Sequence, residues 1–304
     1  MYRLVNAVFS LACIAAGYGL LAGESLSAQS SDITDVEVSG TQSIPGAFAL
    51  VTAIGDIDDN RNGFLGETRW WQQSVSGSFR YHDVSLGLSA AYTRSKKDLD
   101  QHVLTSGPNV GQTVLGGTTK SRSVLLIGNV TYRIGDWNIN ALAGYGRGET
   151  DEFRRGPVLT ATWERDFTIR TAGAGASTLV DLGNSWYVRP DVRFAWIQTI
   201  SEATTDSLNQ TINEKRDRLS RGAVGGELGH ESFFGDLIGK LGVRAHYVYD
   251  FHRAENFTDK SAVDVAAFAT FAGDDVVGGL ELSTTLARDD TDSIAGRVFL
   301  AVRF

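Results

Sequence analysis

The 304-residue chain has a single cysteine, Cys13, and more acidic residues than basic ones, with a net charge of -8. The scarcity of cysteine excludes a fold that depends on disulfides. The negative charge excludes a general affinity for nucleic acid. The sequence also lacks a phosphate-binding loop, a dinucleotide fingerprint and the His and Cys spacing of a zinc site. We therefore expect no cofactor, no metal and no nucleic-acid partner.

Long apolar runs are also missing, except near the N-terminus. Residues 4–21 are mostly apolar, follow the basic Arg3, and precede small residues that end near Ala28. This layout predicts a secretory signal peptide over residues 1–28. A transmembrane anchor is the alternative, but no basic cluster follows it. Because no other stretch reaches the ~20 apolar residues of a helical span, the exported chain is either soluble or a closed barrel in a membrane.

What the sequence does contain is a repeated two-residue alternation. In "VSLGLSAAYT", Val84, Leu86 and Leu88 share one face, while Ser85 and Ser89 share the other. Such alternation indicates two-faced β-strands. After a short N-terminal segment at 29–45, we expect an all-β domain over 46–304. Its twelve strands are predicted at 46–56, 70–81, 84–95, 121–134, 137–147, 166–180, 186–198, 218–230, 238–252, 263–272, 276–287 and 293–304. For residues 46–55, a helix inside the pore is the alternative.

The connections between these strands alternate between short and long. The short ones are expected at 82–83, 135–136, 181–185, 233–236 and 273–275. The long polar ones are expected at 96–120, 148–164, 199–217, 252–262 and 287–294. Alternation of this kind, with an even number of strands, is typical of a transmembrane antiparallel up-and-down barrel in an outer membrane.

The two strand faces differ in kind, which argues against a soluble β-sandwich. One face is apolar and carries aromatic residues near strand ends, as lipid-facing girdles would. These aromatics are Trp71, Tyr81, Tyr92, Tyr132, Trp137, Tyr145, Trp186, Trp196, Tyr247 and Phe251. The other face is charged, and burying it in a dry core would cost several kcal/mol per unpaired ion. We therefore expect it to line a water-filled, predominantly basic lumen, through Arg80, Arg133, Arg170, Arg189, Asp191, Arg193, Glu227, Lys240, Arg244, His246, Asp250, Glu281, Arg297 and Arg303.

The chain ends in "GRVFLAVRF", in which apolar residues alternate back from the final aromatic. This end resembles the terminal strand of Gram-negative outer-membrane barrels. The twelve-strand length is most similar to the translocator domain of autotransporters. The resemblance implies a monomeric barrel in the lipid of a Gram-negative outer membrane. It also implies that the barrel-assembly machinery reads the end, through Val298, Leu300, Val302 and Phe304.

Function is expected to follow this resemblance. Autotransporters carry a long passenger before the barrel, whereas only about 18 to 40 residues separate the expected cleavage site from the first strands. We expect a translocator or pore scaffold without an evident long passenger. The alternative is a stand-alone passive pore that prefers anions.

Three motifs suggest other chemistry, none strongly, so we expect no enzyme. The segment 58–69 spaces Asp58, Asn60, Asn62 and Gly63 like the first half of a calcium loop, but its twelfth position is Arg69 rather than Glu. The pair His230 and Ser232 has the spacing of outer-membrane lipid esterases, and gives a third, less favoured function. The pair His82 and Asp83 resembles that of omptin proteases. Both pairs fall beside short connections rather than at an outer mouth.

Overall fold

The protein is described by a computed structural model that covers most of the chain. The described residues are 6–12, 33–39, 46–59, 66–100, 102–103, 113–114, 116–155, 160–235, 237–252, 260–287 and 291–303. Phe304 and residues 60–65 of the calcium-like segment lie outside them. The predicted signal peptide stays a prediction. β1 (Asn6–Ala12) lies within its range and pairs in an antiparallel ribbon with β2 (Ile33–Ser39), which lies in the segment after it.

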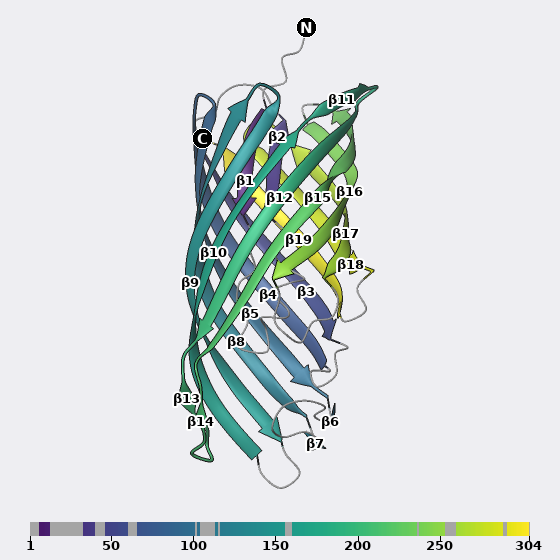
Figure 1. Cartoon of the computed structure of the whole chain (residues 1–304). Helices are drawn as coiled ribbons and strands as arrows, with labels where there is room; N and C mark the ends of the chain where they lie inside the picture. The colour runs from purple at the N-terminus through teal and green to yellow at the C-terminus, as the bar shows by residue number, and fades with distance from the viewer. Residues whose placement is uncertain are drawn as a thin grey trace.

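Twelve long antiparallel strands of the described chain form a closed barrel, as predicted (Figure 1). They are β3 (Gly46–Asp59), β4 (Gly66–Tyr81), β5 (Val84–Leu99), β8 (Gly117–Ile134), β9 (Trp137–Arg155), β10 (Thr160–Thr178), β12 (Trp186–Ser201), β15 (Lys215–Phe234), β16 (Leu237–His252), β17 (Ser261–Ala272), β18 (Val276–Leu286) and β19 (Thr291–Arg303). Among the described residues, no helix is long and apolar enough to cross a membrane.

The barrel closes between its first and last strands. β19 pairs with β3 from Arg303 opposite Ala47 to Thr291 opposite Asp59. The segment 46–56 is therefore a strand, and the alternative of a pore helix is wrong. β10 pairs with β12, the next long strand along the chain, and the short β11 (Val180–Gly183) in their connection also pairs with β12. Neighbouring strands otherwise follow chain order, which is the up-and-down topology.

The two ends of the barrel differ. One end, here the turn end, carries tight turns such as the one at His82, whose φ of 53° is left-handed. The other, the loop end, carries the longer connections and two small hairpins (Figure 1). These hairpins are β6 (His102–Val103) with β7 (Thr113–Val114), and β13 (Thr204–Thr205) with β14 (Thr211–Ile212).

One predicted long connection is wrong and others are shorter than predicted, because the strands continue into them. The expected loop at 148–164 is mostly strand, since β9 ends at Arg155 and β10 begins at Thr160. The polar residues there pair across strands, with Lys120 opposite Asp151. A strand whose outer face meets water needs no apolar residues on that face, so polarity alone does not mark a loop.

The outward face carries an apolar band of the height that a bilayer requires. Leu88, Leu126 and Val298 are all more than half exposed on it. Trp71 and Tyr81 on β4, like Trp186 and Trp196 on β12, share a face about ten residues apart, which is what a tilted strand needs to cross the hydrocarbon core. The band supports a lipid-facing exterior.

The inward face is less uniform than expected. Near the loop end it holds a buried apolar cluster, made of Ala53, Ile57, Trp70, Leu125, Ile127, Leu142, Phe167, Ile169, Ala195, Ile197 and Leu219. The consecutive apolar residues of "VLLIG" in β8 place Leu125 and Ile127 inside, with Leu126 outside. The expectation of an interior lined only by polar groups and water is therefore wrong at this level.

Candidate functional site

The inner wall of the barrel is charged on one side and mostly neutral on the other, where Lys97 of β5 is a buried exception. The charged wall lies on β12, β15, β16, β18 and β19. We define it as Arg189, Asp191, Arg193, Arg221, Glu227, Glu231, Lys240, Arg244, His246, Asp250, Glu281 and Arg297. The hydroxyl wall on β4, β5 and β8 carries buried Gln72, Ser74, Ser76, Ser89, Thr93, Ser121, Ser123 and Thr131.

Glu227 is the centre of the charged wall. Its Oε1 accepts a 2.8 Å hydrogen bond from the Tyr187 hydroxyl, and its Oε2 accepts bonds from Arg189 at 2.7 Å and Arg244 at 3.1 Å. Arg189, Glu227 and Arg244 stand directly opposite one another on three adjacent strands. The Tyr187 ring lies over Gly229, where a side chain would collide with it. This glycine lets the hydroxyl reach the carboxylate.

Arg244 extends the network toward the closing strand. Its Nη1 lies 3.2 Å from Oε2 of Glu281, and the same oxygen accepts a 3.1 Å bond from Nη2 of Arg297. The Arg244 guanidinium also lies 5.6 Å from the centre of the Phe268 ring. The network therefore runs from β12 to β19, and a single arginine joins its two carboxylates.

A second carboxylate group lies beside the first. Asp191 accepts a 2.7 Å bond from Nε of Arg193, and Nε2 of His246 lies 2.9 Å from its Oδ2. Asp191 and His246 share a row with Gly225 between them. The His246 side chain therefore reaches Asp191 across β15, because Gly225 has no side chain to block it.

Two more ion pairs complete the wall, and the sequence prediction missed one member of each. Arg221 binds Asp250 through two bonds of 2.6 and 3.1 Å. Lys240 lies 2.8 Å from Glu231. Arg221 and Glu231 have the same strand parity as Glu227, so the alternation already contained the signal.

Other residues expected in the lumen stand apart from the charged wall, although Arg80 and Arg133 keep the inward parity of their strands. Arg80 and Arg133 sit at the turn end, where each donates a 3.1 Å bond to a turn carbonyl. Arg170 is exposed and stands opposite Tyr145 on the outward face, so it does not join the wall. Arg303 belongs to β19, but its side chain is not among those that the structure describes.

The charges of the wall are paired, with the arginines, lysine and His246 set against five carboxylates. Each of its acids holds at least one base, and Glu227, Asp250 and Glu281 are no more than 4% exposed. A buried charge is tolerated when it is paired and hydrogen-bonded. The arrangement can therefore hold a polar interior together, or exchange its partners with a polar chain that passes through.

The enzyme-like motifs form no catalytic group. Ser232 Oγ lies 3.3 Å from Nδ1 of His230, and the His230 ring packs 4.9 Å from that of Trp186. No hydrogen bond or ion pair joins His230 to a carboxylate in the described chain. His82 and Asp83 form a turn. The described residues contain no group of three His, Cys, Asp or Glu that could hold a metal.

Comparisons with known proteins agree with this geometry. No curated protein matches the chain. The translocator domain of autotransporter NalP from Neisseria meningitidis is similar in structure, with a TM-score of 0.71, 16% identity, and coverage of 87% of this chain and 91% of that one. The beta domain of the Bordetella autotransporter Brka is also similar, with a TM-score of 0.66 and 13% identity. That match covers 86% of this chain and 100% of the Brka domain. The family model for the autotransporter beta-domain matches residues 53–294. The chain thus belongs to the autotransporter beta-domain family.

Proposed function

We propose that this barrel is the translocator of an autotransporter system in the outer membrane of a Gram-negative bacterium. One observation carries the proposal: a closed barrel with an apolar exterior has a polar inner wall along much of its length. The hydroxyl wall offers donors and acceptors at nearly every inward position of β4. An unfolded polypeptide inside such a barrel can satisfy its backbone groups without meeting lipid.

The two walls suit a passing chain in different ways. Serine and threonine hydroxyls rotate, so they can follow the changing pattern of a moving backbone. The charged wall can release Arg189 or Arg244 from Glu227 to bind charged side chains of the cargo. We assign this barrel no catalytic role.

A stand-alone passive pore is the second candidate, since the lumen wall is polar. The paired, buried charges of the wall disfavour it, because they leave little of that wall exposed to mobile ions. They also leave few uncompensated cations to select anions.

Epitope tags placed at three positions test the proposal in a Gram-negative host. One tag is inserted at residue 41 ahead of β3, one in the turn at Gly135, and one in the hairpin at Leu208. A translocator exposes the tags at 41 and 208 on intact cells and hides the tag at 135. If the tag at 41 is reached only after lysis, while the purified barrel conducts ions steadily in a planar bilayer, the passive pore is correct.

A further inference from the structure

A basic patch lies on the outward face of β4, β5 and β8, toward the loop end. It consists of Arg69, Arg94, Lys96, Lys120 and Arg122. Arg94 stands directly opposite Arg122, and Arg69, Lys96 and Lys120 form a row across the three strands. Like charges directly opposite one another destabilise a sheet. Their concentration here therefore points to a ligand that compensates for the repulsion.

The patch begins where the apolar band ends. Trp71 stands directly opposite Arg94, and its ring meets that of Tyr92 edge-to-face at 6.0 Å. Tyr92 precedes Arg94 by two residues on the same face. Trp and Tyr mark the interface between hydrocarbon and headgroups, so the side chain of Arg94 lies at headgroup level.

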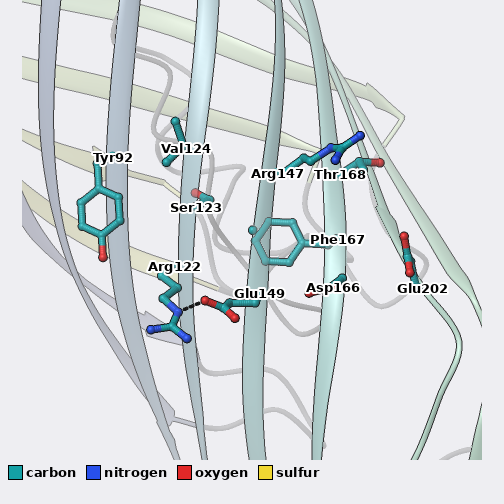
Figure 2. Close-up of a pocket in the computed structure, with 11 residues that line it drawn as sticks. Tyr92, Arg122, Ser123, Val124, Arg147, Glu149, Asp166, Phe167, Thr168 and Glu202 are labelled. Carbon is teal, nitrogen blue, oxygen red and sulfur yellow. Dashed lines mark ion pairs between the residues drawn. The ribbon is translucent and has the colours of Figure 1, made fainter.

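Part of the positive charge of the patch makes no ion pair among the described residues. Arg122 pairs with Glu149 on β9 (Figure 2), and Lys96 lies 2.7 Å from Asp98. Lys120 stands directly opposite Asp151 on β9, but neither Arg94 nor Lys120 makes a hydrogen bond or ion pair within the described chain. Two cations thus remain available at the membrane interface.

The basic patch has apolar residues on one side and acidic residues on the other. A groove of about 420 Å³ lies among the five basic side chains and Trp71, with Asp151 as the one acidic residue of its lining. On the membrane side the outward residues are aliphatic, with Leu88, Val124 and Leu126 about half exposed or more. On the other side the next row is acidic, with Glu67 directly opposite Asp98. An anionic group therefore fits in the basic row, with its apolar part running toward the band.

We propose that the basic patch binds the phosphate headgroup of an anionic lipid in the outer leaflet. Arg94 and Lys120 hold the phosphate oxygens, as guanidinium and ammonium groups do, and the acyl chains lie along Leu88, Val124 and Leu126. The inference rests on the proposed function, which places the loop end at the outer surface.

Lipid retention by the purified full chain tests this inference. The chain is held in an uncharged detergent and offered phosphatidic acid or phosphatidylcholine with the same acyl chains, and native mass spectrometry counts the bound lipids. We expect phosphatidic acid to be preferred. The double variant R94Q/K120Q should bind it about 30-fold more weakly. The matched control R216Q/R218Q removes two exposed cations at the loop end of β15 and should leave the affinity unchanged.

Three results would overturn the inference. They are equal loss in the two double variants, no preference between the two lipids, and complete displacement of the lipid by inorganic phosphate, which would indicate a site for free phosphate. A heat-dependent gel shift reports barrel folding for each variant. If R94Q/K120Q does not fold, the single variant K120Q is measured in its place, with a loss of about fivefold expected. The tag experiment does not depend on these residues, so the two proposals can fail separately.

Discussion

Nε2 of His246 lies 2.9 Å from Oδ2 of Asp191, although a complete strand runs between β16 and β12. The intervening residue is Gly225. A Cβ atom at this position would collide with the carbonyl oxygen of Ala245 and come within 2.8 Å of the His246 ring. The contact between His246 and Asp191 therefore depends on the absence of a side chain at residue 225.

Replacing Gly225 with alanine should destabilise the barrel by about 1–3 kcal/mol, the range for overpacking a filled site. The free energy of unfolding in urea, followed by tryptophan fluorescence in detergent, measures the loss. Gly128→Ala is the matched control, because a Cβ at Gly128 meets nothing within 4 Å. Equal unfolding midpoints for the two variants would show that the crowding at Gly225 is relieved.

Replacing Glu227 with glutamine should cost about 3–5 kcal/mol, because it leaves the buried guanidinium groups of Arg189 and Arg244 without their shared carboxylate. The same urea titration measures the change. Glu164→Gln, at an exposed outward position, is the control and should change stability by less than about 0.5 kcal/mol. Adding Arg244→Gln should recover part of the loss, whereas strictly additive costs would mean that the two residues are not coupled.

Stability at the loop end should depend on the ionisation of Asp58. Burial raises the pKa of this carboxyl above 3.8, and Glu67, Asp292 and Asp56 raise it further. The folded state therefore binds this proton more tightly than the unfolded state, so stability is lost as pH rises through the raised pKa.

Asp58→Asn should accordingly stabilise the barrel at pH 7, and the gain should disappear as pH falls toward 3.8. Unfolding midpoints across this pH range test it, with Asp136→Asn in the opposite turn as control. A gain that does not change with pH would mean that the repulsion around Asp58 is not its source.

The final aromatic should matter for assembly more than for stability. Val298 and Leu300 face outward on the closing strand, and Phe304 follows it. We expect Phe304→Ala to lower the fraction inserted into the membrane of cells, while refolding in detergent is nearly unaffected. Phe271→Ala removes an exposed outward Phe from β17 and serves as control. Equal insertion of both variants in cells would count against an assembly signal.

The strands could be predicted because alternation is a local property. Tyr187, Arg189 and Asp191 fall on the inward face that their parity assigns them. Sequence alternation mispredicts which face a charged residue occupies where the strands become long and polar. Arg170 is an example, since it lies near the point where the outward face changes from lipid to water. An outward charge has no cost at that point, so the charge of Arg170 does not mark the inward face.

The ion-pair geometry could not be predicted, because it depends on register between strands. Nothing in the sequence places Glu281 beside Arg244, two strands away. The pairing of the charges in the wall follows from such contacts. A residue count along the strands cannot show this pairing, and the anion preference that the count suggested stays a prediction.

Closure between β3 and β19 also limits how the barrel can form. The residue pairs that join these strands connect opposite ends of the domain sequence. They contribute no stabilisation until the intervening chain is ordered, and closing so long a loop costs conformational entropy. Until then, both edge strands present unpaired backbone groups, a state prone to aggregation. The slow step in maturation is therefore expected to be formation of this seam, and a catalyst that holds one edge while the other arrives would accelerate it most.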